Sequence, residues 1–168
     1  TMEAENNKQE KPGEKLQKKQ QEKSKEASGR VAIVLVRGMV RVSQPVKDTL
    51  AMLRLNRKNH CSVISMNAVY RGMLKKVKDY VTWGEISDEL YKELISKRGE
   101  EYKGRTSDSK QKYTFKTIEF EGKKYKPYFR LNPPKKGFGR KGVKMAFKLG
   151  GALGYRGDKM ADLVMRML

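Results

Sequence analysis

His60 and Cys61 are the residues whose chemistry most suggests catalysis, because an imidazole can act as a base and a thiolate as a nucleophile. They open an apolar stretch, residues 60–66, that predicts a β-strand. Neighbouring side chains of a strand point to opposite faces, so these two cannot form the hydrogen-bonded pair that catalysis requires. We therefore expect Cys61 to lie in the core.

Residues 137–142 read Gly-Phe-Gly-Arg-Lys-Gly, the glycine spacing of dinucleotide-binding loops. That motif requires a strand before it and a helix after it, whereas Pro133, Pro134, Lys135 and Lys136 precede it here. The glycines are better interpreted as points where the backbone can approach phosphates closely. We predict no nucleotide cofactor.

The remaining reactive residues indicate neither catalysis nor metal binding. One cysteine cannot form an internal disulfide, and together with one histidine it cannot supply the four ligands of a structural zinc site. The carboxylates concentrate in residues 87–98 and in the first thirty residues, where they serve as helix-capping and solubilising charges. We expect no enzymatic activity, no cofactor and no metal.

Charge is the strongest functional signal. The 168 residues contain 39 Lys and Arg against 19 Asp and Glu, a net charge of +20. Residues 130–151 alone hold seven basic residues and no acid. Such a segment repels itself unless a polyanion neutralises it, which predicts nucleic acid as the partner. No apolar run approaches the ~20 residues of a bilayer span, and no signal sequence is evident, so we expect a soluble, cytoplasmic protein.

A second basic surface is predicted on a helix that begins after Asn67. Arg71, Lys75 and Lys78 recur at helical spacing opposite an apolar face formed by Val69, Met73, Val77 and Tyr80. The stripe either contacts RNA or is an ordinary solvated face. Gly72 beside it suggests close approach either of RNA or of a neighbouring element, and His60 faces either RNA or solvent.

Composition divides the chain into four segments. Residues 1–29 form a charged tail with too few apolar side chains to fold, and we expect it to be disordered. Residues 30–98 are predicted to form an RNA-binding α+β core. Residues 99–129 are a variable insertion containing a possible hairpin. Residues 130–168 combine the basic Gly/Pro loop with a C-terminal helix.

Hydrophobic periodicity predicts the elements that position these residues. Residues 30–36 predict a buried strand, and strands are also expected at 60–66 and 80–83. Helices are predicted from the Ser43-Gln44-Pro45 start to about Leu55, from Asn67 through Tyr80, over 87–98, and after Asp158. Residues 117–120 and 125–130 suggest a hairpin, although Pro127 would keep its strand at a sheet edge.

Several motifs resemble the L-thirty family of large-subunit ribosomal proteins, whose eukaryotic members are numbered seven. They are Val36-Arg37-Gly38, Thr49-Leu50 with Leu53 and Leu55, Asn59-His60-Cys61, and the run from Tyr70-Arg71-Gly72-Met73 to Trp83-Gly84. The run from Arg130 to Gly137, with Gly150-Gly151-Ala152-Leu153-Gly154, resembles the extension of archaeal and eukaryotic members. Residues 99–129 look shorter than the helical segment of most archaeal relatives.

The resemblance implies a β-α-β-α-β core, ferredoxin-like in part, with two helices on one face of a small sheet, a helical and basic-loop C-terminal extension, and direct binding to large-subunit rRNA. It implies a monomer within the ribosome, with neighbouring ribosomal proteins and with neither membrane nor small-molecule substrate. The alternatives are a free-standing basic RNA-binding protein and a subunit of an RNA-processing enzyme. The residues predicted to bind RNA are Arg37, Gly38, His60, Arg71, Gly72, Lys75, Lys76, Lys78, Arg130, Pro133, Pro134, Lys135, Lys136, Gly137, Arg140, Lys141, Lys144, Lys148, Gly150 and Gly151.

Overall fold

The computed structural model describes residues 29–168, so the predicted disordered tail falls almost entirely outside the described residues. Its elements are β1 (Arg30–Leu35), α2 (Gln44–Met52), β2 (His60–Ser65), α3 (Ala68–Val77), β3 (Val81–Glu85), α4 (Asp88–Arg98), β4 (Ile118–Phe120), β5 (Lys123–Tyr125), β6 (Phe129–Arg130), the 3-10 turn η1 (Phe147–Leu149), β7 (Gly154–Tyr155) and α5 (Lys159–Met165). The order confirms the predicted α+β class with a β-α-β-α-β core.

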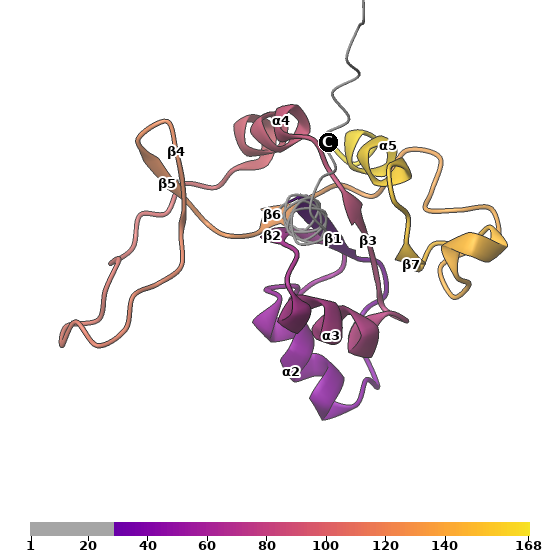
Figure 1. Cartoon of the computed structure of the whole chain (residues 1–168), viewed down its shortest axis with the longest axis horizontal. Coiled ribbons are helices and arrows are strands. Elements are labelled where there is room, and N and C mark those ends of the chain that lie inside the picture. Colours follow the sequence, from indigo (N-terminus) through magenta and orange to yellow (C-terminus); the bar gives the residue numbers. More distant parts are fainter. Residues whose placement is uncertain (1–28) are drawn as a thin grey trace, which may run out of the picture.

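A five-stranded mixed sheet with the order β6-β2-β1-β3-β7 forms the centre of the molecule (Figure 1). β1 pairs antiparallel with both β2 and β3, and β7 runs parallel to β3. Five of the six residues of β1 are buried. The uninterrupted apolar run 31–36 therefore marks a strand covered on both faces, as the sequence predicts.

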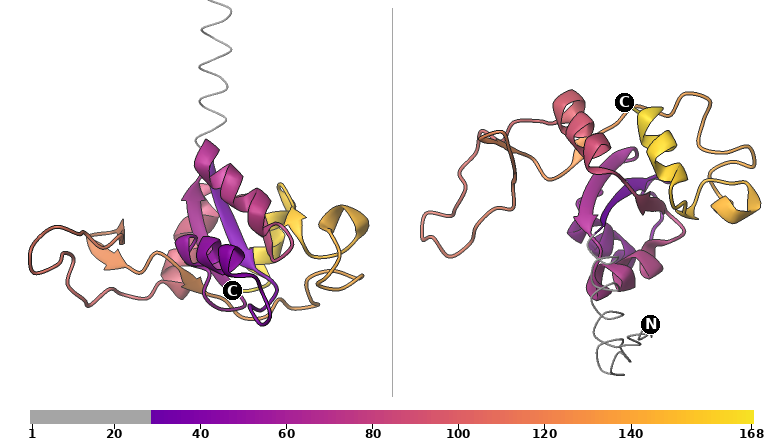
Figure 2. Two further views of the ribbon diagram at one scale, coloured as in Figure 1. Left: turned by 90° about the horizontal axis from the view of Figure 1, so that it is seen from below. Right: turned by 45° about the horizontal axis from the view of Figure 1, so that its top comes forward.

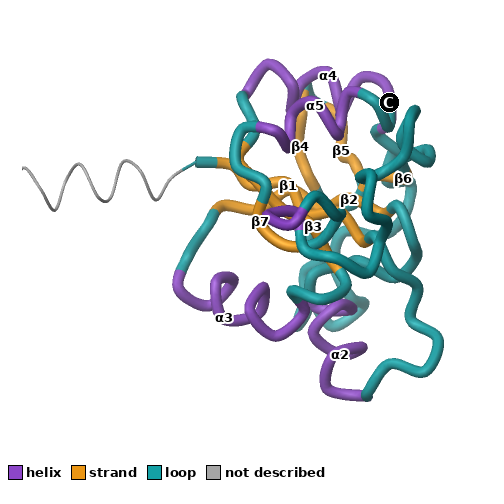
Figure 3. The backbone as a smooth tube through the Cα atoms, turned by 90° about the vertical axis from the view of Figure 1, so that its right-hand side faces the viewer, coloured by secondary structure: helices purple, strands orange, loops and turns teal. Residues whose placement is uncertain are grey.

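Helices α2 and α3 cover one face of the sheet (Figure 3). Val31, Ile33 and Leu35 of β1 pack there against buried leucines of the α2 region and against Leu74 and Val77 of α3. Val69, which we expected to face inward, is 64% exposed. Met73, Val77 and Tyr80 do pack inward as predicted. The buried stripe of α3 follows Tyr70, Met73, Leu74 and Val77 at helical spacing, and Val69 lies one position outside it.

Helices α4 and α5 cover the opposite face (Figure 3). Ala32, Val34 and Cys61 point to this side and pack with Leu94 and Ile95 of α4 and with the apolar side of α5. Cys61 is completely buried, and burial raises the pKa of its thiol to about 12. Its predicted place in the core is confirmed, and it is not a nucleophile at neutral pH.

Local signals explain most helix starts. The Asn67 side chain accepts a hydrogen bond from the Tyr70 amide at 2.9 Å, and Ser87 accepts one from Leu90 at 3.3 Å. At Asp158 the structure gives no side-chain capping bond. The helix that we expected to reach about Leu55 ends at Met52, because the chain turns through Arg54 in a left-handed conformation (φ 61°).

The predicted hairpin is correct in its first half and wrong in its second. β4 pairs with β5, but Pro127 interrupts the expected strand 125–130, and Phe129 and Arg130 join the main sheet beside β2 instead. β7 was not predicted, since a strand of two residues, one of them a glycine, carries no periodic signal. The hairpin supports a long loop, residues 102–117, that we call the arm.

The arm and the C-terminal loop 131–153 project from opposite sides of the layered core (Figures 1 and 2). The backbone of each extension therefore reaches beyond the helices that cover the sheet. The two surfaces are separated by the sheet and its four covering helices.

Candidate nucleic-acid interface

The C-terminal loop is a hydrogen-bonded structure despite its few regular elements. The Lys141 amide donates to the Gly150 carbonyl at 3.2 Å, and the Ala152 amide donates to the Met145 carbonyl at 2.9 Å. The 3-10 turn η1 ends at Gly150, whose φ of 87° favours glycine. The backbone of the loop thus has one defined path that can hold charges at fixed positions.

Two loop glycines serve internal packing. A Cβ at Gly139 would lie 2.5 Å from the Gly151 carbonyl oxygen, and one at Gly151 would collide with the Met145 backbone. Their role is close contact between two stretches of this chain, which corrects the interpretation of all these glycines as phosphate approaches. A Cβ at Gly137 or Gly142 would meet nothing within 4 Å, so the backbone there is open to a partner.

Arg156 holds the loop to the sheet and was missed by the sequence analysis. Its buried guanidinium donates to Thr82 Oγ1 at 2.9 Å, to the Phe138 carbonyl at 2.8 Å and to the Ala152 carbonyl at 3.1 Å. It also lies 4.5 Å from the centroid of the Phe147 ring. Burial and the nearby Arg166 lower the pKa of Arg156 to about 10, which leaves it charged at neutral pH.

Arg166 of the last turn fixes the start of the same loop. Its guanidinium donates to the carbonyls of Lys135 at 3.1 Å and Gly137 at 3.0 Å, and it pairs with Asp162 at 3.1 Å. Arginine suits this task because its planar fork supplies several donors at once. The guanidinia of both arginines therefore bind main-chain carbonyls of this loop.

Six cations of the loop remain exposed. Within residues 29–168 none of them has an ion-pair partner, and they are Lys135, Lys136, Arg140, Lys141, Lys144 and Lys148. Arg130, in contrast, pairs with Glu100 at 3.1 Å. Glu100 also pairs with Lys126 at 2.7 Å, so it compensates Arg130 only in part, whereas the six loop cations have no ion-pair partner among the described residues.

Helix α3 presents the second basic surface. Arg71, Lys75, Lys76 and Lys78 are all exposed, and a Cβ at Gly72 would meet nothing within 4 Å. The packing interpretation of Gly72 is therefore wrong. An open groove of about 450 Å³ runs beside Gly72 between α2 and α3.

Arg37 and Gly38 lie at the end of α3. Arg37 donates to the Asp79 carbonyl at 3.1 Å, and its guanidinium lies 5.0 Å from the centroid of the Tyr80 ring. Gly38 is exposed with open space around it. Val36, which precedes them, packs against Ala152 and Leu153. The turn formed by Arg37 and Gly38 therefore lies between the α3 cations and the C-terminal extension.

Three residues predicted to bind RNA are largely buried within the protein. Pro134 and Gly151 belong to the packed side of the loop. His60 is 8% exposed and stacks on Tyr128, with ring centroids 5.3 Å apart. Burial, together with the charges of Arg130 and Arg57, lowers its pKa. Arg37 is partly buried, and the remaining predicted residues, Pro133 and Gly150 among them, are exposed.

Within residues 29–168, no cluster of three or more His, Cys, Asp or Glu could hold a metal ion. No helix in that range is both long and apolar enough to cross a membrane.

Comparison with known proteins gives one consistent family. Residues 31–81 match the family described as Ribosomal protein L30p/L7e. The chain is 43% identical over 151 residues to the large ribosomal subunit protein uL30 of Nanoarchaeum equitans, covering 82% of this chain and 97% of that protein. It is 46% identical to the uL30 protein of Methanococcus maripaludis, covering 82% and 98%, and 42% identical to that of Methanopyrus kandleri, covering 79% and 100%. The chain belongs to the ribosomal protein L30p/L7e family.

Proposed function

We propose that this chain is a structural constituent of the large ribosomal subunit and that it binds ribosomal RNA mainly through phosphate contacts. Its relatives named above are large ribosomal subunit proteins, and the similarity spans nearly their whole length. Such a role requires no catalytic residue. It requires cations that are exposed, unpaired and held in register with a phosphate backbone.

The six exposed cations of the C-terminal loop are the observation that carries this proposal. They have no acidic partner in residues 29–168, and they sit on a backbone that Arg156 and Arg166 hold in place. Mutual repulsion among them disfavours the free state, and phosphates relieve it. Because the loop is already ordered by its own hydrogen bonds, little entropy is lost when RNA binds.

Helix α3 and the turn at Arg37 supply a second contact. Lys75 and Lys76 lie in the last turn of α3, where they also complement the helix dipole. Gly72 leaves a gap in the side-chain layer of the same helix. A sugar-phosphate backbone fits this combination, because the cations attract it and the missing side chain allows it to come close.

Sedimentation tests membership of the subunit. A structural constituent is expected at near one copy per large subunit after washing at high salt. A free-standing RNA-binding protein or a subunit of a processing enzyme would be substoichiometric or would wash off. Recovery far below one copy would contradict the proposal.

Salt dependence tests the contact surface. Changing Lys135, Lys136, Arg140 and Lys141 together to Ala should reduce the slope of log K against log salt by about three for a ribosomal RNA fragment, since each phosphate contact contributes roughly 0.7–0.9. The matched control changes Lys92, Lys97, Lys123 and Lys124, three of which already pair with glutamates. Equal slopes for the two variants would refute the assignment of the loop.

A further inference from the structure

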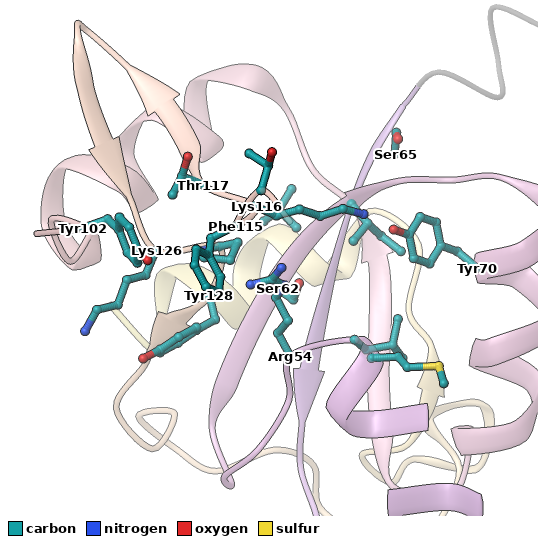
Figure 4. A pocket seen from close by; sticks show the side chains of 16 residues that line it. Arg54, Ser62, Ser65, Tyr70, Tyr102, Phe115, Lys116, Thr117, Lys126 and Tyr128 are labelled. Atoms are coloured by element: carbon teal, nitrogen blue, oxygen red, sulfur yellow. The ribbon is translucent and has the colours of Figure 1, made fainter. Parts of the chain in front are cut away.

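A large cleft separates the arm from the sheet (Figure 4). The arm lies on the side of the molecule away from the C-terminal loop (Figure 1). Its volume is about 850 Å³, within the roughly 300–1,000 Å³ typical of ligand sites. One wall consists of Arg54, Tyr70 and residues 62–65, and the other consists of Tyr102, residues 114–117 and residues 126–128. Tyr70 belongs to α3, but none of the cations of the two basic surfaces described above lines the cleft.

The arm that forms the outer wall has defined hydrogen bonds. The Phe115 amide donates to the Thr106 carbonyl at 3.0 Å, and the Asp108 amide donates to the Tyr113 carbonyl at 3.0 Å. The Tyr102 hydroxyl donates to the Arg105 carbonyl at 2.8 Å. The side chains of residues 114–117 are therefore presented to the cleft from an ordered backbone.

The electrostatics of the cleft favour an anion. Its lining contains three cations and no acid, and the arm as a whole carries five basic residues and one acid. Lys126 pairs with Glu100 at 2.7 Å, but Glu100 also pairs with Arg130 at 3.1 Å, so this one carboxylate does not cancel both positive charges. Arg54 and Lys116 have no ion-pair partner in residues 29–168, and in Figure 4 Lys116 extends across the cleft toward Tyr70 while Arg54 points into it from below.

The aromatic residues of the cleft favour unpaired bases over other anions. Phe115 is 52% exposed on the arm, and Tyr70, Tyr102 and Tyr128 also line the cleft. Tyr128 is already stacked on His60. Aromatic rings beside cations are the arrangement on which single-stranded nucleic acid stacks its bases while its phosphates are neutralised.

We propose that this cleft binds a short unpaired segment of RNA, with a base stacked on Phe115 and with phosphates contacted by Arg54 and Lys116. The proposal rests on the proposed ribosomal function and adds a second recognition mode to it. An RNA duplex keeps its bases stacked inside and offers only its backbone, so it fits the C-terminal loop better than the cleft. A basic protein segment is disfavoured by the positive charge of the walls.

Binding of a labelled oligouridine of about twelve nucleotides to the full chain tests the stacking contact. Phe115→Ala should weaken binding roughly fivefold or more, which is the effect of losing one base–aromatic stack. The matched control is Tyr113→Ala, since Tyr113 is 71% exposed on the same arm but does not line the cleft. Equal loss in both variants, or none in Phe115→Ala, would overturn the proposal.

A matched pair of lysine variants tests the contact between Lys116 and a phosphate. Lys116→Gln should lower the slope of log K against log salt for oligouridine by about 0.7 and weaken binding, whereas Lys112→Gln should do so less. Both lysines are exposed on the arm, and only Lys116 lines the cleft. Equal effects would show that the arm attracts RNA without a cleft site.

Crosslinking inside the subunit identifies the occupant. A photoreactive phenylalanine analogue at position 115 of the full chain is incorporated into large subunits, and a crosslink to an unpaired ribosomal RNA nucleotide is expected. A crosslink to protein, or to paired RNA only, would overturn the cleft proposal. Incorporation is measured separately and tests the ribosomal function, so the failure of one proposal is distinguishable from the failure of the other.

Discussion

Replacing Arg156 with alanine should loosen the C-terminal loop from the sheet. The guanidinium makes three hydrogen bonds, two of them to the carbonyls of Phe138 and Ala152, which lie on the two sides of the loop. The third goes to Thr82 of β3. The substitution removes all three donors and leaves both carbonyls without the partner that connects them to the sheet.

The change in the free energy of unfolding depends on two opposing contributions, which are the hydrogen bonds that are lost and the cost of burying the Arg156 charge, which is removed. A hydrogen bond from an ionised group contributes roughly 1.5–3 kcal/mol, and an unpaired buried acceptor costs about 1–3 kcal/mol. Two effects offset this loss. A neighbouring cavity of about 300 Å³ lets water reach the vacated carbonyls, and the substitution also relieves the cost of burying a charge. We expect the free energy of unfolding to fall by about 2–4 kcal/mol.

Urea unfolding and amide hydrogen exchange measure the effect. The midpoint should fall, and the amides of Lys141 and Ala152, which are bonded within the loop, should exchange faster. Arg140→Ala is the control, because Arg140 is exposed in the same loop and should change stability by no more than about 0.5 kcal/mol. Arg156→Lys should remain destabilised, since an ammonium cannot reproduce the planar fork. An unchanged midpoint in Arg156→Ala, or full rescue by lysine, would refute the reasoning.

Three further predictions concern two glycines and the histidine. Gly72→Ala should raise the free energy of unfolding by about 0.5–1 kcal/mol in thermal melts, because the site is helical and open, while Gly72→Lys should weaken competitive incorporation into large subunits despite its added charge. Gly84→Ala should lower stability by about 1–3 kcal/mol in urea titrations, because the new Cβ would collide with the Gly157 carbonyl and lie 2.6 Å from Met160 Cβ. His60 has a pKa below 6.5 in the fold, so the unfolded state takes up the proton first as the pH falls. The free energy of unfolding should therefore drop as the pH falls through 6.5 and level off below the pKa of His60 in the fold. His60→Phe should abolish that drop when unfolding is measured as a function of pH. A drop that persists in the variant would contradict the assignment to His60.

The layered core could be predicted because its signals are local. The apolar run of β1 indicated a strand buried on both faces, and the capping residues Asn67 and Ser87 marked where α3 and α4 begin. Each of these signals lies within one element of the chain. The hydrophobic periodicity of each strand and helix also indicates which of its faces packs in the core.

The C-terminal extension was harder to predict because long-range contacts define it. β7 consists of two residues that pair with β3, and Arg156 contacts Thr82 across a separation of 74 residues. Neither contact leaves a periodic pattern. The same reason explains the error at residues 125–130, where Pro127 divides one apolar stretch between the hairpin and the main sheet.

The composition of the sequence does not show which cations are bonded within the protein and which are free to bind RNA. Residues 130–168 contain ten basic residues, but Arg130 is paired with Glu100 and the guanidinia of Arg156 and Arg166 are bonded to main-chain carbonyls. A charge count treats these three like the exposed lysines, although each already has a partner within the protein. The arginines hold the loop, while lysines supply five of its six free cations. This division suits the chemistry of the two side chains, because a rigid fork fixes backbone geometry whereas a flexible ammonium adjusts to a phosphate. Removing a lysine should therefore change affinity alone, whereas removing Arg156 should change both stability and affinity.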